Sequence, residues 1–114
     1  MKPELVFGIL SDSTRLRALM LIQSEGEVCV CELTHALQAS QPKISRHLAL
    51  MRDAGIVEPR RDGPWMHYRL SHSIPEWARR IVEMSHYQLS DIPIFIRDAQ
   101  RLLQMCNRPE RNCG

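Results

Sequence analysis

The chain has 114 residues, a formal net charge of +2 and four cysteines. This length suits one domain with a single core, and no apolar run approaches the roughly 20 residues that span a bilayer. The N-terminus lacks the charged-then-apolar layout of a signal peptide. We therefore expect one cytoplasmic domain over 1–114 with reduced cysteines. The weakly basic pI near 8.5 does not by itself indicate a nucleic-acid binder.

The N-terminal part of the chain has the period of an amphipathic helix. The polar run from Ser11 to Thr14 can cap a helix, and Gly26 can end it. Between them, apolar residues recur at helical spacing: Leu16, Leu19, Met20 and Ile22. The pattern predicts one helix before residue 26.

Two further helices are predicted close together over about 30–54. The first has an apolar stripe and ends near residues 38–40. The second starts at Ser40, a suitable N-cap, with Pro42 in its first turn and Gly55 after its end. The two apolar stripes are Val30, Leu33, Ala36 and Leu37, and then Ile44, Leu48 and Met51. Helices separated by so few residues indicate a helix-turn-helix.

The period then changes to that of β-structure over about 56–70. Asp62 and Gly63 form a typical hairpin turn, and Pro64 lies beside it. Residues 65–70 alternate as in a strand. The sequence therefore predicts a mainly α fold with a two-stranded β wing, a winged helix-turn-helix.

Helical spacing resumes over about 75–106, and Pro93 starts a separate last helix. These C-terminal helices carry much apolar surface, from Trp77 to Leu103. We expect a second copy of the chain to cover it, so that the protein is a homodimer. The alternative is packing within one chain only.

The outward face of the third predicted helix, the one that starts at Ser40, is basic and polar. Its first two turns hold Gln41, Lys43, Ser45, Arg46 and His47, in the part of a recognition helix that enters the major groove of double-stranded DNA. Gln and Arg can pair with base edges, whereas Lys and Ser more often contact phosphates. His47 lies nearer the apolar stripe, so packing on the core is its alternative role.

Two arginines precede the turn of the wing. Arg60 and Arg61 can reach the DNA backbone or minor groove beside the helix. Taken alone, they are equally consistent with a solvated surface.

Cys29 and Cys31 flank Val30 at the start of the second predicted helix, the one that begins near residue 30. In a regular helix they would lie about 200° apart. Binding of one ion by both sulfurs would then unwind the first turn and disturb the helix-turn-helix. We also expect the helix N-terminus to lower the pKa of these thiols. Soft thiolates select soft ions, and the alternative is that both cysteines are buried filler.

The chain resembles the ArsR-type (ArsR/SmtB) family of metalloregulatory repressors, closest to its arsenite-responsive members, over about residues 5–84. The resemblance is carried by the segments LSDSTRLR (10–17), EVCVCEL (27–33), SQPKISRHL (40–48), GIV (55–57) and YRL (68–70). It implies a homodimer that reads a pseudo-palindromic operator and is released when thiolates bind As(III) or Sb(III), which derepresses an arsenic-resistance operon. No organic cofactor is implied.

This sequence departs from the family pattern at one ligand position. Arsenite-responsive members place a third cysteine three residues after the Cys-x-Cys pair, where this chain has Thr34. Cys106, Cys113, a small thiol or a solvent ligand could complete the site. The histidine and carboxylate pattern of zinc-responsive members is not evident at His72 and His86, which we expect to be surface residues.

Three alternative functions can be compared with this one. The same cysteines could sense Cd(II), Zn(II) or oxidation in a repressor of the same fold. A thiol enzyme such as an arsenate reductase is disfavoured, because no phosphate-binding loop accompanies the cysteines. A purely structural dimerisation module would leave Gln41, Lys43 and Arg46 without a role.

Overall fold

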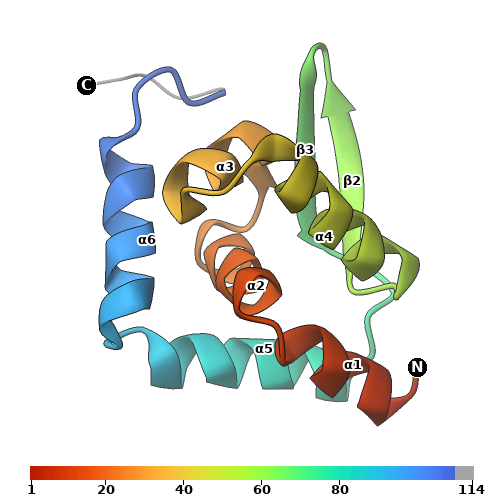
Figure 1. Ribbon diagram of the computed structural model, residues 1–114. Coiled ribbons are helices and arrows are strands. Elements are labelled where there is room, and N and C mark those ends of the chain that lie inside the picture. The colour runs from red at the N-terminus through yellow and green to blue at the C-terminus, as the bar shows by residue number, and fades with distance from the viewer. Residues whose placement is uncertain (110–114) are drawn as a thin grey trace.

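In the computed structural model, described here for residues 1–109, the chain folds into helices and one three-stranded antiparallel sheet (Figure 1). The elements in chain order are α1 Pro3–Leu10, α2 Ser13–Glu25, β1 Val28–Cys29, α3 Val30–Leu37, α4 Gln41–Asp53, β2 Val57–Asp62, β3 Trp65–Leu70, α5 Glu76–Leu89 and α6 Pro93–Gln104.

Helix α2 begins where the polar run predicted it. The side chain of Asp12 accepts a hydrogen bond from the Arg15 amide at 3.0 Å, which caps the helix N-terminus. Gly26 ends the helix at a φ of 84°, a conformation that favours glycine. Helix α1 was not predicted, because its apolar residues run together without the polar positions that would reveal a helical period.

The predicted helix-turn-helix is confirmed as α3 and α4. Gln38 adopts a left-handed conformation that ends α3. Ser40 then caps α4 by accepting a hydrogen bond from the Lys43 amide at 3.3 Å, and Pro42 occupies the first turn. The chain therefore leaves one helix and enters the next within three residues.

The predicted wing is the hairpin of β2 and β3, which projects beyond the helices in Figure 1. The hairpin turns at Gly63, whose φ is 57°. The strand order is β1-β3-β2, and β1 places Cys29 opposite His67. Strand β1 was not predicted, since two residues are too few to show alternation. It joins the cysteine motif to the wing through the sheet.

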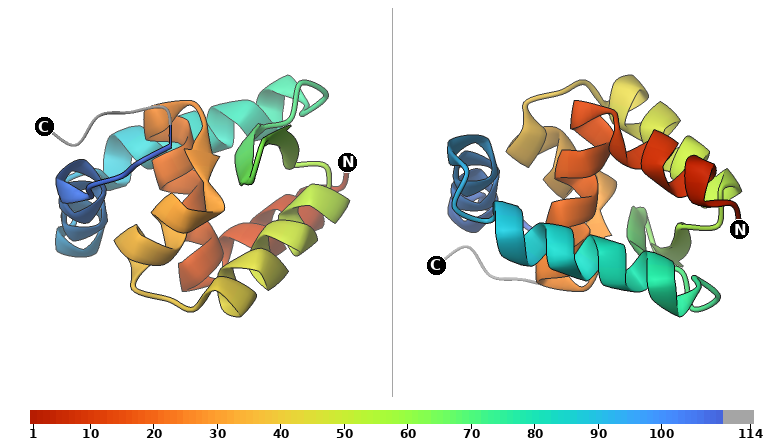
Figure 2. Two further views of the ribbon diagram at one scale, coloured as in Figure 1. Left: turned by 90° about the horizontal axis from the view of Figure 1, so that it is seen from above. Right: turned by 90° about the horizontal axis from the view of Figure 1, so that it is seen from below.

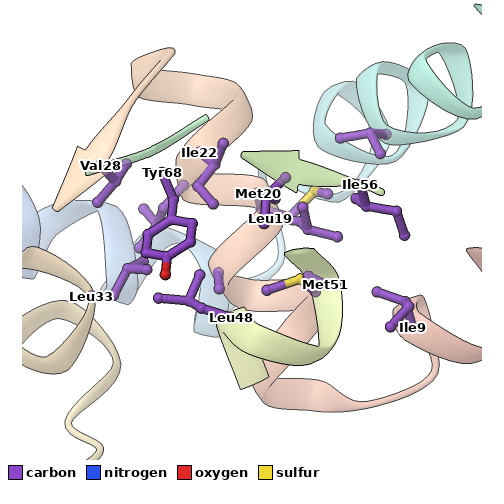
Figure 3. Close-up of a cluster of buried hydrophobic side chains, with 14 of the residues drawn as sticks. Ile9, Leu19, Met20, Ile22, Val28, Leu33, Leu48, Met51, Ile56 and Tyr68 are labelled. Carbon is purple, nitrogen blue, oxygen red and sulfur yellow. The ribbon is translucent and has the colours of Figure 1, made fainter. Parts of the chain in front are cut away.

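The core forms around α2, which lies at the centre of the helices (Figures 1 and 2). Buried side chains from α2, α3, α4 and the sheet meet there (Figure 3), including Leu19, Ile22, Val28, Leu33, Leu48, Met51, Ile56 and Tyr68. The predicted apolar stripes of α3 and α4 therefore face inward, which leaves the other side of α4 exposed.

The last two helices separate at Pro93, as predicted, and α6 packs against α3 and α2. A buried ion pair fixes this packing. Arg17 on α2 donates to both carboxylate oxygens of Asp98 on α6, at 2.8 and 2.7 Å. Asp98 is only 1% exposed.

Large apolar side chains remain exposed on the outer helices. They lie on α1, α5 and α6, and include Phe7, Trp77, Met84, Tyr87, Ile96 and Leu103. None of the helices within residues 1–109 is both long and apolar enough to cross a membrane.

Candidate nucleic-acid interface and thiol site

The outer face of α4 carries most of the predicted DNA-reading residues. Gln41, Lys43, Ser45 and Arg46 are all exposed, while Ile44 between them is buried. The cap at Ser40 starts the helix so that these residues occupy its first two turns. Four side chains suited to base edges and phosphates therefore point away from the core.

His47 does not share this face. It is 8% exposed, and its Nδ1 lies 3.2 Å from Nη1 of Arg15 on α2. Burial lowers its pKa more than the nearby Asp12 raises it. Because Arg15 can only donate, the neutral ring accepts this hydrogen bond at Nδ1. The structure thus places His47 in the α2–α4 contact, which is its alternative role of packing on the core.

The two wing arginines differ in their surroundings. Arg61 is exposed, whereas Arg60 binds the carboxylate of Glu27, with its Nη2 2.6 Å from Oε1. This pair lowers the pKa of Glu27. Arg60 therefore ties the wing to the turn before β1, and Arg61 is the wing arginine directed to solvent.

The two cysteines of the motif lie side by side. The Cys31 thiol is 3.1 Å from the sulfur of Cys29 and donates a hydrogen bond to it. The expectation that they point about 200° apart was wrong, because Cys29 is not inside the helix. It is the N-cap of α3, with an extended backbone at φ −79° and ψ 152°. One ion can contact both sulfurs without unwinding α3.

The pKa of Cys31 was also predicted in the wrong direction. Burial, the neighbouring Cys29 sulfur and the charge of Glu32 raise the pKa of Cys31 to about 12. A hydrogen bond from the Glu32 backbone amide acts the other way and is outweighed. Cys31 is therefore a protonated thiol at neutral pH.

A pocket connects the cysteine pair to the DNA-binding elements. We call it the thiol pocket. Its walls come from the start of α3, the first turns of α4 and the wing, and it is lined by Cys29, Val30, Cys31, Thr34, Gln41, Ser45, Pro64, Trp65, Met66 and Tyr68. Anything bound to the sulfurs therefore also lies next to residues of α4 and β3.

Comparisons with known proteins agree with this architecture. The family model described as "Bacterial regulatory protein, arsR family" matches residues 12–59. The "Arsenic resistance transcriptional regulator ArsR1" of Pseudomonas putida is 49% identical, over 95% of this chain and 83% of the relative. The "Arsenical resistance operon repressor" of Escherichia coli K12 is 43% identical, over 96% and 93%. The chain belongs to the ArsR family.

A solved structure supports the fold of this ArsR-family chain. The "AntR antimony-specific transcriptional repressor" superposes with a TM-score of 0.63 at 26% identity, covering 77% of each chain. The family consists of regulatory proteins, so this ArsR-family protein is a transcriptional regulator with a DNA-binding helix-turn-helix and not an enzyme.

In the described part of the chain, the local site of this ArsR-family protein offers the two sulfurs of Cys29 and Cys31 as ligands. Within residues 1–109, no three His, Cys, Asp or Glu side chains are grouped so that they could hold a metal ion. Thr34 donates its hydroxyl to the carbonyl of Cys31 at 2.8 Å. Cys106 is disulfide-bonded, contrary to the expected free thiol, and Cys113 lies outside the described residues.

His72 and His86, the histidines compared with the zinc-responsive pattern, differ in their surroundings. His72 is exposed and contacts the carboxylate of Glu58 on β2. His86 was expected on the surface, but it is half-buried beside an apolar pocket between α2, α5 and α6.

Proposed function

We propose that this protein is a homodimeric, cytoplasmic repressor of an arsenic-resistance operon, released from its operator when As(III) or Sb(III) binds Cys29 and Cys31. The observation that carries the proposal is the sulfur pair, 3.1 Å apart inside a pocket whose other walls are the recognition helix and the wing. The names of the relatives, which refer to arsenic resistance and antimony, support the class of inducer.

The DNA contacts proposed for one subunit come from α4 and the wing. Gln41 and Arg46 suit base edges, whereas Lys43 and Ser45 suit phosphates. Arg61 extends the contact from the wing. The burial of His47 and the ion pair of Arg60 with Glu27 give those two residues supporting roles, which hold α4 and the wing in place.

Release of DNA follows from what surrounds the sulfurs. Cys29 belongs to β1, whose partner strand β3 leads into the wing, and Gln41 and Ser45 line the same pocket. An ion with its remaining ligands adds volume between α3, α4 and the wing. The recognition helix and the wing must then shift relative to each other, which favours the conformation with lower operator affinity.

The chemistry of arsenous acid suits protonated thiols. For each As–S bond formed, an As–OH bond breaks and the hydroxide leaves with the thiol proton as water, so As(OH)3 and two thiols give a dithiolate As–OH species and two waters. No proton is released to solution. The raised pKa of Cys31 therefore does not oppose arsenite binding near neutral pH.

The test is an operator-release titration with arsenite in reducing buffer. Cys29→Ser and Cys31→Ser should bind operator DNA as the wild type does and lose release by arsenite. Equal release from these variants would refute the proposed site. Thr34→Ala, which changes the same pocket without removing a sulfur, is the matched control and should still be released.

The same titration identifies the third ligand and the inducer. The reducing buffer opens the disulfide of Cys106, so its sulfur is free to bind in this assay. Loss of release in Cys106→Ser or Cys113→Ser would assign that sulfur as a ligand, whereas full release in both leaves the position to a small thiol or solvent. Antimonite should release the operator like arsenite. Release by Cd(II), Zn(II) or an oxidant at lower concentration than arsenite would replace our proposal with a regulator of the same fold that responds to that signal.

A further inference from the structure

One buried arginine joins the segment after α6 to the cysteine motif. Arg108 donates from Nε to Oε2 of Glu32 at 2.5 Å and from Nη2 to Oε1 of Glu25 at 2.7 Å. Its side chain is only 9% exposed. The segment passes back from α6 towards the end of α2, as Figure 2 (left) shows. The guanidinium thereby ties together the end of α2, the start of α3 and the C-terminal segment.

Glu32 connects this arginine to the thiol pair. Its Oε1 accepts a hydrogen bond from the backbone amide of Cys29 at 2.8 Å, the reciprocal half of a capping box at the start of α3. Glu32 is 1% exposed. One carboxylate oxygen of Glu32 therefore accepts from the Cys29 backbone, and the other accepts from Arg108.

We propose that Arg108 is a positioning residue for inducer binding, which acts through Glu32 to hold Cys29 in the N-cap conformation that places its sulfur beside Cys31. The inference rests on the proposed function, because it concerns ion binding by those two thiols. It adds the C-terminal segment to the inducer site, although Arg108 itself offers no ligand to the ion.

The physical argument is the cost of a buried charge. A buried carboxylate that loses a bonded cation is destabilised, and the carboxylate is better solvated if it moves towards water. If Glu32 leaves its place, the Cys29 amide loses its acceptor and the N-cap geometry loosens. Ion binding must then also order the two sulfurs, and removal of such an outer partner typically weakens a metal site about 10- to 100-fold.

The recognition helix does not take part in this linkage. Arg108 is bonded to α2 and α3, and the residues proposed to read DNA lie on α4 and the wing. Substitution of Arg108 should therefore change inducer affinity but not operator affinity. Arg108→Gln should raise the arsenite concentration for half-release by about 10- to 100-fold, with operator affinity in the absence of arsenite unchanged within about twofold.

Arg101→Gln is the matched control. Arg101 also reaches α3 from the C-terminal part of the chain, but it donates to the carbonyl of Ala36 at 3.4 Å, near the opposite end of that helix. This variant loses an arginine without touching Glu32 and should respond to arsenite as the wild type does. Arg108→Lys keeps the charge but not the paired N–H donors of the guanidinium. Its arsenite concentration for half-release should therefore lie between those of the wild type and Arg108→Gln.

A double-mutant cycle tests the route through Glu32. Glu32→Gln removes the charge that Arg108 offsets and can still accept from the Cys29 amide. In that background Arg108→Gln should have little additional effect on arsenite release. A full additional loss would mean that Arg108 acts by another route and would overturn the proposal.

Amide hydrogen exchange provides a measurement that does not depend on arsenite. In Arg108→Gln the Cys29 amide should exchange faster than in the wild type, while the Leu48 amide in α4 keeps its protection and shows that the fold is intact. Unchanged exchange at Cys29, or an arsenite response equal to that of the wild type, refutes the role of Arg108. A wild-type protein that arsenite does not release refutes the proposed function, and the exchange result then still decides whether Arg108 holds the cap.

Discussion

The proton on Cys31 separates two classes of inducer. A divalent cation must expel thiol protons into solution, whereas each hydroxide that arsenous acid loses takes up one thiol proton and leaves as water. Because the pKa of Cys31 is raised to about 12, this group stays protonated over the whole range in which a regulator can be assayed. We therefore expect the binding of arsenous acid to depend less on pH than the binding of a divalent cation.

This difference predicts opposite pH profiles for two ions. Between about pH 6 and 8, arsenite affinity should be nearly flat, while Cd(II) affinity should rise about tenfold per pH unit from the Cys31 proton alone. The sign follows because higher pH removes the proton that competes with Cd(II). Direct ion titrations at three pH values measure both slopes, and a Cd(II) affinity that does not change with pH would contradict the high pKa of Cys31.

Arg46 is exposed on α4 and is one of the two side chains there that suit a base edge. If it pairs with a base edge, Arg46→Ala should cost about 1–3 kcal/mol of operator affinity. Arg52→Ala is the control, since Arg52 lies on the same helix near its other end and pairs with the adjacent Asp53. Operator-binding titrations at one fixed salt concentration compare the two variants. Equal affinities for both would remove Arg46 from the contact surface.

The residue types of the site were predictable from the sequence, but the predicted position of Cys29 was wrong. A helical wheel assumes that both cysteines are inside a regular helix, whereas Cys29 is its extended N-cap. The spacing of Cys29 and Glu32 matches a capping box with sulfur in place of a hydroxyl, and this signal could have shown the cap. The long-range partners of Glu32 and His47 leave no such local signal.

At the scale of elements, a buried ion pair contributes to the attachment of α6. Asp98→Ala should lower the free energy of unfolding by about 3 kcal/mol or more, because it leaves the partly buried Arg17 without its carboxylate. Asp91→Ala, at an exposed position before α6, should have little effect. Chemical denaturation of both variants gives the comparison. Equal unfolding midpoints would show that apolar packing alone holds α6.

The elements differ in how well the sequence predicted them. Helices α2 to α6 and the wing have either a clear apolar period or a clear capping or turn residue. Both kinds of signal come from residues close together in the sequence. Strand β1 and helix α1 have neither. The two residues of β1 are extended because they pair with β3, about 40 residues away, and a pairing over that distance has no local pattern.

At the scale of the whole molecule, the exposed apolar side chains on α1, α5 and α6 form the surface that the proposed homodimer would bury. Met84→Glu should shift the protein towards monomer, because dimerisation would bury the new charge. Sedimentation over a range of concentrations measures this shift. Operator affinity should fall as the monomer fraction rises, since two linked subunits bind a pair of half-sites more tightly than one subunit binds one half-site. A wild-type protein that is monomeric at all concentrations would contradict the assembly.

The position of the thiol pocket has a consequence for the order in which DNA-bound and unbound repressor molecules bind the inducer. Gln41 and Ser45 line this pocket and also belong to the surface proposed to face DNA. By reciprocity, the factor by which a bound ion weakens operator binding is the factor by which operator DNA weakens ion binding. If arsenite is the inducer, as proposed, repressor molecules bound to DNA are the last to bind it, because unbound molecules have the higher affinity and take up the first ions. The arsenite concentration at which the genes switch on should then rise with the amount of repressor in the cell.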